Sequence, residues 1–154
     1  MHPALLRLRA QGWSVVADPA LTIPAAILAR HGPLPAAWTA CFATIALCAD
    51  ASEQSWFVTP ALMRGVDDSA YAWNEPERQS LEAAEGDPVW TAQITEYWDA
   101  HLPLRFSVAS GYASWALCLR GPRAGTVVHA LAPEFEVDSV VAADLDAYLA
   151  QLAG

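Results

Sequence analysis

The sequence predicts an α+β fold: a twisted, mostly antiparallel sheet, centred on a C-terminal meander, with helices packed around it. The strands are clearest between Leu102 and Ala130, where three apolar runs are separated by glycine-containing turns at 110–111 and 121–125. Runs with helical spacing of apolar residues lie on both sides of this stretch. The chain has 154 residues, of which 55% are hydrophobic and 16% charged, so it can bury one substantial core. We expect a single domain over residues 1–154.

Three elements are expected in the first thirty or so residues. Pro3 to Gln11 favours a short helix, because proline suits the first turn and Gly12 follows the last. Trp13 to Ala17 is rich in β-prone residues and predicts an edge strand. Pro24 to Arg30 predicts a second short helix, which the Gly-Pro pair at 32–33 ends.

The run from Pro35 to Cys48 has apolar residues at helical spacing and predicts a buried helix. Its stripe consists of Trp38, Cys41, Phe42, Ile45 and Cys48. Ser55 to Thr59 then predicts a strand. Thr59-Pro60 has the character of a helix cap followed by a first-turn proline, and Gly65 should end that short helix.

Two further helices are expected before the meander. Asn74 to Glu77 matches a capping box, in which the asparagine covers the helix start and the glutamate reaches back; this helix should run to Glu85. Asp87-Pro88 opens the next helix.

Within the meander, Tyr112 to Leu119 is apolar on both faces and predicts a central strand. An acidic loop or short strand is expected at Ala132 to Ser139, and a last helix within Val140 to Leu152.

The chain is strongly acidic. It contains 17 Asp and Glu against eight Arg and no Lys, which gives a net charge of −9. This charge repels phosphate backbones and argues against nucleic-acid binding, while it would attract a basic protein partner. An acidic excess can also serve solubility alone, and the sequence does not decide between these two roles.

Cysteine usage and hydropathy point to a cytoplasmic protein. Cys41, Cys48 and Cys118 lie in apolar runs, as reduced and buried thiols do. The N-terminus lacks the apolar core and cleavage site of a signal peptide. The uncharged stretch from His31 to Ala49 has an apolar part of about 14 residues, short of the ~20 that a membrane span needs.

No sequence motif for catalysis, metal binding or phosphate binding occurs. Cys118 and His129, on neighbouring expected strands, are the nearest approach to a nucleophile and a base, and the apolar surroundings of Cys118 favour an inert thiol instead. His129, Glu134, Glu136 and Asp138 could supply metal ligands, but their spacing matches no known site. We therefore expect no enzyme, no metal and no cofactor.

An interaction surface is the remaining candidate site. Tyr71 and Trp73 fall outside any periodic stripe and lie between acidic residues in an expected loop. An aromatic anchor within an acidic rim suits a basic protein partner; alternatively, these aromatics hold the loop over the core. The candidate partner-binding residues are Asp67, Asp68, Tyr71, Trp73, Glu75, Glu77, Glu134 and Glu136.

The order of parts resembles the SUKH superfamily, named for similarity to a fungal cell-wall synthesis regulator. The resemblance lies in LPAAWTACFATIALCADASEQSWFVT (34–59), SAYAWNE (69–75), LPLRFSVASGYASWALCL (102–119) and TVVHALAPEFEVDSVVAADLDAYLAQL (126–152). A departure is the Cys-Ala-Asp-Ala turn at 48–51, where many relatives have an Asn-Gly-Gly-like turn. The resemblance implies an α+β binder without catalytic residues, and bacterial members are mostly immunity proteins of polymorphic toxin systems.

Three functional hypotheses follow. The first is a cytoplasmic immunity protein that occludes a cognate toxin, and the net charge of −9 suits a basic, nuclease-type toxin. The second is a housekeeping regulatory or scaffold protein of the same fold, bound to an endogenous partner. The third is a small hydrolase that uses Cys118 and His129. The identity of the partner, the binding face and the oligomeric state stay open.

Overall fold

The computed structural model describes residues 1–65, 71–131 and 137–154. It confirms the α+β class: the described strands form one antiparallel sheet, in which the spatial order β1 to β7 is also the sequence order. The strands are β1 (Ser14–Ala17), β2 (Ile45–Ala49), β3 (Ser55–Phe57), β4 (His101–Ser107), β5 (Ala113–Cys118), β6 (Val127–Ala130) and β7 (Ser139–Ala142). The helices are α1 (Pro3–Ala10), α2 (Ala25–His31), α3 (Ala36–Phe42), α4 (Pro60–Arg64), α5 (Glu75–Ala83), α6 (Pro88–Asp99) and α7 (Leu145–Leu152).

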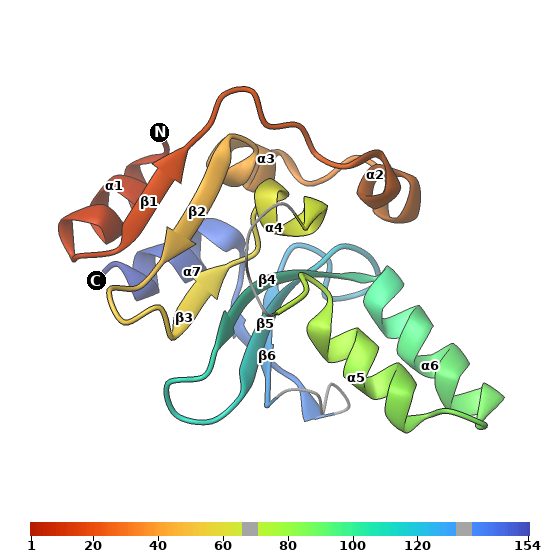
Figure 1. The fold of residues 1–154 in the computed structure, drawn as a ribbon. Coiled ribbons are helices and arrows are strands. Elements are labelled where there is room, and N and C mark those ends of the chain that lie inside the picture. The colour runs from red at the N-terminus through yellow and green to blue at the C-terminus, as the bar shows by residue number, and fades with distance from the viewer. Residues whose placement is uncertain (66–70, 132–136) are drawn as a thin grey trace.

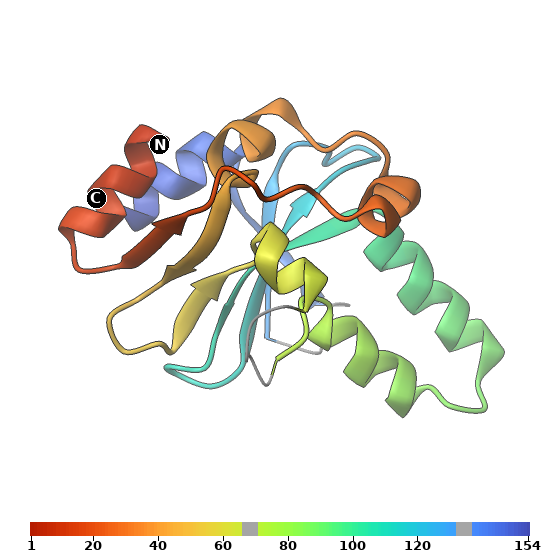
Figure 2. The same cartoon turned by 45° about the horizontal axis from the view of Figure 1, so that its top comes forward.

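Helices cover the two faces of the sheet unequally (Figures 1 and 2). The helices α1, α3 and α7 pack on one face, called face A, which includes Phe57, Leu117 and Val127. The α5–α6 hairpin packs on the other face, called face B, against Ala116 and Val128. Because Ala116 and Leu117 are both buried, β5 is covered on both sides, as expected for a central strand.

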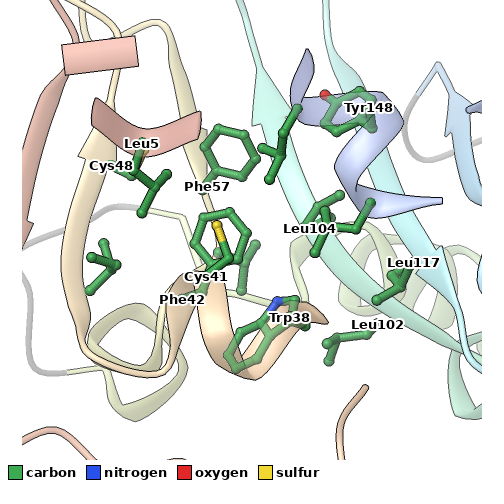
Figure 3. Close-up of a cluster of buried hydrophobic side chains, with 14 of the residues drawn as sticks. Leu5, Trp38, Cys41, Phe42, Cys48, Phe57, Leu102, Leu104, Leu117 and Tyr148 are labelled. Atoms are coloured by element: carbon green, nitrogen blue, oxygen red, sulfur yellow. The ribbon is translucent and has the colours of Figure 1, made fainter. Parts of the chain in front are cut away.

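The main core lies between face A and its three helices (Figure 3). The ring of Phe42 on α3 stacks on that of Phe57 on β3, with centroids 5.0 Å apart. Leu5 of α1 and Leu149 of α7 are fully buried in the same cluster. Burial of side chains of this size stabilises the fold by roughly 1.5–3 kcal/mol each.

The expected helix from Pro35 to Cys48 is wrong in its second half. Helix α3 ends at Phe42, and the chain turns through Ala43 and Thr44 into strand β2. Ile45 and Cys48 still face the core, but from a strand that carries an irregularity in its pairing with β1. A short run that is apolar on all sides satisfies helix and strand patterns equally, which explains the error.

The cap signals were correct at two of three helices. Thr59 Oγ1 accepts from the Leu62 amide at 3.3 Å, and an Asp87 carboxylate oxygen accepts from the Trp90 amide at 3.0 Å. The capping box at Asn74 is wrong, because the Asn74 side chain makes no capping hydrogen bond. That helix also ends at Ala83, two residues earlier than expected.

The C-terminal region contains a strand that the sequence did not separate from the last helix. Val140 and Val141 lie in β7, and α7 begins only at Leu145, capped by the Asp144 carboxylate through the Ala147 amide at 2.7 Å. Among the residues that the structure describes, no helix is both long enough and apolar enough to cross a membrane.

Candidate functional site

An apolar pocket opens on face B near the N-terminal side of the sheet. Its volume is about 390 Å³. Leu47 and Trp56 contribute from β2 and β3, Leu62 from α4 and Val108 from the end of β4. Glu53 is the one charged residue among the described residues that line it. The remaining lining residues are Ala46, Ala49, Phe57, Thr59 and Tyr71.

The pocket lies over a seam in the sheet. Strands β2 and β3 pair at a single position, Ala49 with Trp56, because α4 begins at Pro60 and turns the chain away. Thr59 bridges the seam: its hydroxyl donates to the Ala46 carbonyl at 3.0 Å. The short pairing therefore leaves room between the strands, which the lining side chains only partly fill.

A chain of aromatic rings forms one wall of the pocket. The Trp56 ring lies 5.3 Å from that of Tyr71, and the Tyr71 ring lies 5.6 Å from that of Tyr112. Trp56 also meets Phe106 edge-on at 6.1 Å. Tyr71 was predicted as a partner-binding residue; the structure places it at the pocket, in ring contact with Trp56 and Tyr112.

The free edge of β7 is a second surface. Among the described residues, β7 pairs only with β6. Three large apolar side chains near this edge are exposed: Leu131 (61%), Val137 (70%) and Val140 (48%). The described pairing of β6 with β7 ends at His129 with Ser139, so Leu131 and Val137 lie just beyond it. We call Leu131, Val137 and Val140 the edge patch.

An ion pair between Arg123, whose side chain is 39% exposed, and the largely buried Asp138 fixes the start of β7. Both terminal nitrogens of Arg123 donate to the Asp138 carboxylate at 2.8 Å, and the Tyr97 hydroxyl donates to it at 2.7 Å. The hydrogen bonds from Arg123 hold the pKa of Asp138 below its usual value. Strand β7 therefore begins from a position tied to α6 and to the β5–β6 turn.

The other edge of the sheet differs from β7. The Arg9 side chain donates to the Val15 carbonyl of β1 at 2.8 Å and so occupies part of that edge. Native sheets often protect an edge strand in this way, with a charged side chain that blocks pairing with another chain. No side-chain hydrogen bond to the backbone of β7 occurs among the described residues.

The acidic residues predicted for partner binding do not form one surface in the described part of the chain. Glu77 is buried, and its two carboxylate oxygens accept from Arg30 at 2.6 and 2.8 Å. Glu75 accepts from the Ala72 amide and from Arg78, both at 3.1 Å. Both carboxylates are thus engaged within the chain.

Trp73 lies partly buried against the main core, in agreement with the alternative in which the aromatics hold the loop over the core. The four remaining candidates, Asp67, Asp68, Glu134 and Glu136, lie outside the described residues.

The proposed nucleophile and base do not meet. Trp115 pairs with His129 and shares its face, so Cys118, three residues further along β5, lies on the opposite face of the sheet. Cys118 is buried, and its sulfur donates to the Arg120 carbonyl at 3.3 Å. No group of metal-ligating side chains occurs among the described residues.

Sequence reasoning did not find either surface. The pocket depends on Leu47 and Val108, which fell within an expected helix and an expected strand and were not candidate site residues. The edge patch depends on β7, which was merged with the last helix. An available signal was the pair of β-branched residues Val140 and Val141, which favours a strand.

Comparison with known families supports a different relationship from the one expected. The family model for coenzyme PQQ synthesis protein D (PqqD) matches residues 109–154, which carry β5, β6, β7 and α7. No curated protein matches the chain. No solved structure matches it either.

The SUKH resemblance is therefore wrong, and with it the immunity-protein interpretation. The resemblance relied on the order of helices and strands, and the structure removes part of that order: the long first helix is a short helix and a strand. What remains is a similarity of the last third of the chain, three strands and a helix, to PqqD.

Proposed function

We propose that this chain is a non-catalytic peptide-binding module, in which the exposed edge of β7 accepts an extended peptide as an added strand. The observation that carries the proposal is the edge itself: within the described part of the chain β7 pairs only with β6, and the edge patch lies near it. A strand edge offers unpaired N–H and C=O groups to a peptide, and flanking apolar side chains add specificity.

The match to PqqD supports the same role, because it covers β7 and suggests a peptide-binding partner in cofactor biosynthesis. The match thereby supports the second hypothesis above, a scaffold bound to an endogenous partner, better than the first. The separation of Cys118 from His129 removes the nucleophile–base pair that the sequence offered, which favours binding over catalysis. Three free, buried cysteines suit a reducing compartment such as the cytoplasm.

The charge of the chain suggests the character of the peptide. With a net charge of −9, and with Glu134 and Glu136 preceding β7 in the sequence, a basic peptide associates faster than an acidic one. Val140 faces outward on face B beside the unpaired backbone, so an apolar residue of the peptide gains burial against it. We expect an extended, basic segment with alternating apolar residues.

Selection from a displayed library of random peptides of about twelve residues tests this role. The selected peptides should be basic and should bind with Kd below about 100 µM. Amide hydrogen exchange should show protection of Ser139–Ala142 in the complex. Protection confined to another part of the chain, or a failure to select any binder, would contradict the proposal.

Proline substitutions locate the binding edge. Neighbouring residues in a strand point their N–H groups to opposite sides. One of the variants Ser139→Pro and Val140→Pro therefore removes an N–H that points to the outer edge, and the other removes a hydrogen bond to β6. The variant that keeps its stability in urea should lose peptide binding. The matched controls Ser139→Ala and Val140→Thr should bind, and unchanged binding in both proline variants would exclude β7.

A further inference from the structure

The pocket over the seam has features that pairing of β7 with a peptide does not use. It lies between β2 and β3, at the far side of the sheet from β7, and none of its lining residues belongs to the segment that matches PqqD. We propose that this pocket is a second binding site, which takes a large apolar side chain of a protein partner that carries Arg or Lys next to it.

An exposed apolar strip extends the pocket on both sides. Val16 pairs with Leu47 across β1 and β2, and both side chains are about half exposed, at 49% and 43%. Val108, on the other side of the pocket, is 36% exposed, and its amide donates to the Gln54 carbonyl at 2.8 Å. The apolar surface therefore runs across four strands, which is longer than a small molecule in the pocket would cover and suits a polypeptide segment.

Trp56, which lines the pocket, carries an indole N–H that is not paired within the described part of the chain. The nitrogen atom of this group is buried. A buried N–H without an acceptor costs roughly 1–3 kcal/mol. Because Trp56 lines the pocket, the signal of this N–H should respond when a ligand fills the pocket.

The rim of the pocket sets the charge of the partner. Glu53 is exposed and lies in the β2–β3 turn with a φ of 57°, in the left-handed region. Asp50 fixes this turn by accepting from the Gln54 amide at 2.8 Å and from the Ser55 amide at 3.1 Å. No cation lines the pocket among the described residues. A carboxylate on a fixed turn beside an apolar cavity, in a chain of net charge −9, favours a cationic residue next to the side chain that enters the pocket.

Three blocked pentapeptides with the central sequences Lys-Trp-Arg, Glu-Trp-Glu and Lys-Ala-Arg separate these contributions. Binding is followed by the indole N–H signal of Trp56 in ¹H–¹⁵N spectra, assigned with Trp56→Phe. Lys-Trp-Arg should shift this signal and bind about fivefold more tightly than Glu-Trp-Glu. Lys-Ala-Arg should bind at least about tenfold more weakly than Lys-Trp-Arg, because the apolar anchor is missing.

Variants of this chain test the charged residue at the pocket, Glu53, and the apolar strip separately. Glu53→Gln should remove the preference for Lys-Trp-Arg over Glu-Trp-Glu, and Glu85→Gln, an exposed carboxylate at the end of α5, should retain it. Leu47→Arg places a positive charge on the strip and should abolish binding, with urea unfolding as the check of the fold. The proline variants of β7 should leave this binding unchanged, so the two proposed sites succeed or fail separately.

Two results would overturn the proposal. Equal affinity for Lys-Trp-Arg and Glu-Trp-Glu would contradict the claim that the partner carries Arg or Lys next to the buried side chain. Indole alone, bound as tightly as Lys-Trp-Arg and at the same Trp56 signal, would make the pocket a small-molecule site.

Discussion

The guanidinium carbon of Arg105 lies 3.8 Å from the centre of the Trp115 ring, on face A of the sheet. Arg105 is 9% exposed, and its Nε atom has no hydrogen-bond partner among the described residues. The same row of paired residues runs from Phe57 through Arg105, Trp115 and His129 to Ser139. Within the described ranges, this cation therefore contacts the aromatic rings of Trp115 and Tyr148 and forms no ion pair with a carboxylate.

Replacement of Arg105 by Met should leave the free energy of unfolding unchanged or raise it. Burial lowers the pKa of Arg105, which means that the charged form is disfavoured where it lies. Methionine keeps the apolar stem and loses only the cation–π contact, worth about 0.5–2 kcal/mol. Arg105→Ala removes the stem as well and should cost about 2–4 kcal/mol.

Urea unfolding of the two Arg105 variants measures this difference. Arg7→Met, on the exposed side of α1, is the matched control and should change stability by less than ~0.5 kcal/mol. A large loss in Arg105→Met would show that the charge itself is needed, and would point to an anionic partner for it.

The ion pair of Arg30 with Glu77 should be the strongest charge interaction between α2 and α5. Its two hydrogen bonds measure 2.6 and 2.8 Å, and the Glu77 side chain is only 7% exposed. Glu77→Gln should cost about 2–3 kcal/mol, because it leaves Arg30 half-buried with one fewer carboxylate. Hydrogen bonding to Glu77 also raises the pKa of Arg30, so the arginine stays charged at every working pH.

Asp99 provides the comparison for that pair. It also accepts from Arg30, at 2.8 Å, but its side chain is 41% exposed, so Asp99→Asn should cost less than about 1 kcal/mol. A double-mutant cycle with Arg30→Met measures each coupling in urea. If Glu77→Gln and Asp99→Asn lower the free energy of unfolding equally, burial does not determine which carboxylate pairs more strongly with Arg30.

Particular residues show how far the sequence specified this fold. The meander was predictable because β4, β5 and β6 each combine alternation or two-sided burial with glycine turns. Ile45 and Cys48 were misassigned because an apolar run of that length fits two periods. Glu77 was read as a cap because its partner, Arg30, is 47 residues away in sequence and no local rule reveals it.

The candidate sites were less predictable than the fold. Tyr71 was identified from its position outside any stripe, but its contact with Trp56 depends on how the loop returns to the sheet. The pocket depends on the single pairing position between β2 and β3, which is a property of tertiary structure. Whether Cys118 and His129 meet depended on register, because neighbouring strands bring residues close only when they share a face.

Stability should fall as the pH is lowered through about 6.5. The His101 ring lies flat on Tyr97, with centroids 3.9 Å apart, and its Nδ1 lies 2.7 Å from the Tyr97 carbonyl. Burial lowers the pKa of His101, and burial likewise lowers the pKa of His31 and of His129. Each unfolded histidine takes up a proton near pH 6.5 while its folded form stays neutral to lower pH, so protons favour the unfolded chain.

Urea midpoints between pH 8 and pH 5 measure this slope, which is at most ~1.4 kcal/mol per pH unit for each histidine. His101→Phe keeps a ring on Tyr97 without a titrating group and should reduce the slope. Asp138 does not titrate between pH 8 and pH 5, because Arg123 lowers its pKa from 3.8. The slope in this range therefore does not come from Asp138. A urea midpoint that does not change with pH in the parent chain would contradict the buried, neutral state of these histidines.

Native thiols should resist labelling. Cys41 and Cys48 are free and buried in the main core, and burial raises the pKa of each to about 12 (Figure 3). Cys118 is 2% exposed. Reaction with a disulfide reagent at pH 8 requires the core to open, which should slow it by about 10³-fold or more relative to the urea-unfolded chain. An Ala51→Cys variant, in the exposed β2–β3 turn, should gain one thiol that reacts rapidly under the same conditions. If one thiol of the parent chain reacts rapidly and this reaction is lost in Cys118→Ala, Cys118 is accessible and reactive. That result would support a catalytic role for this residue.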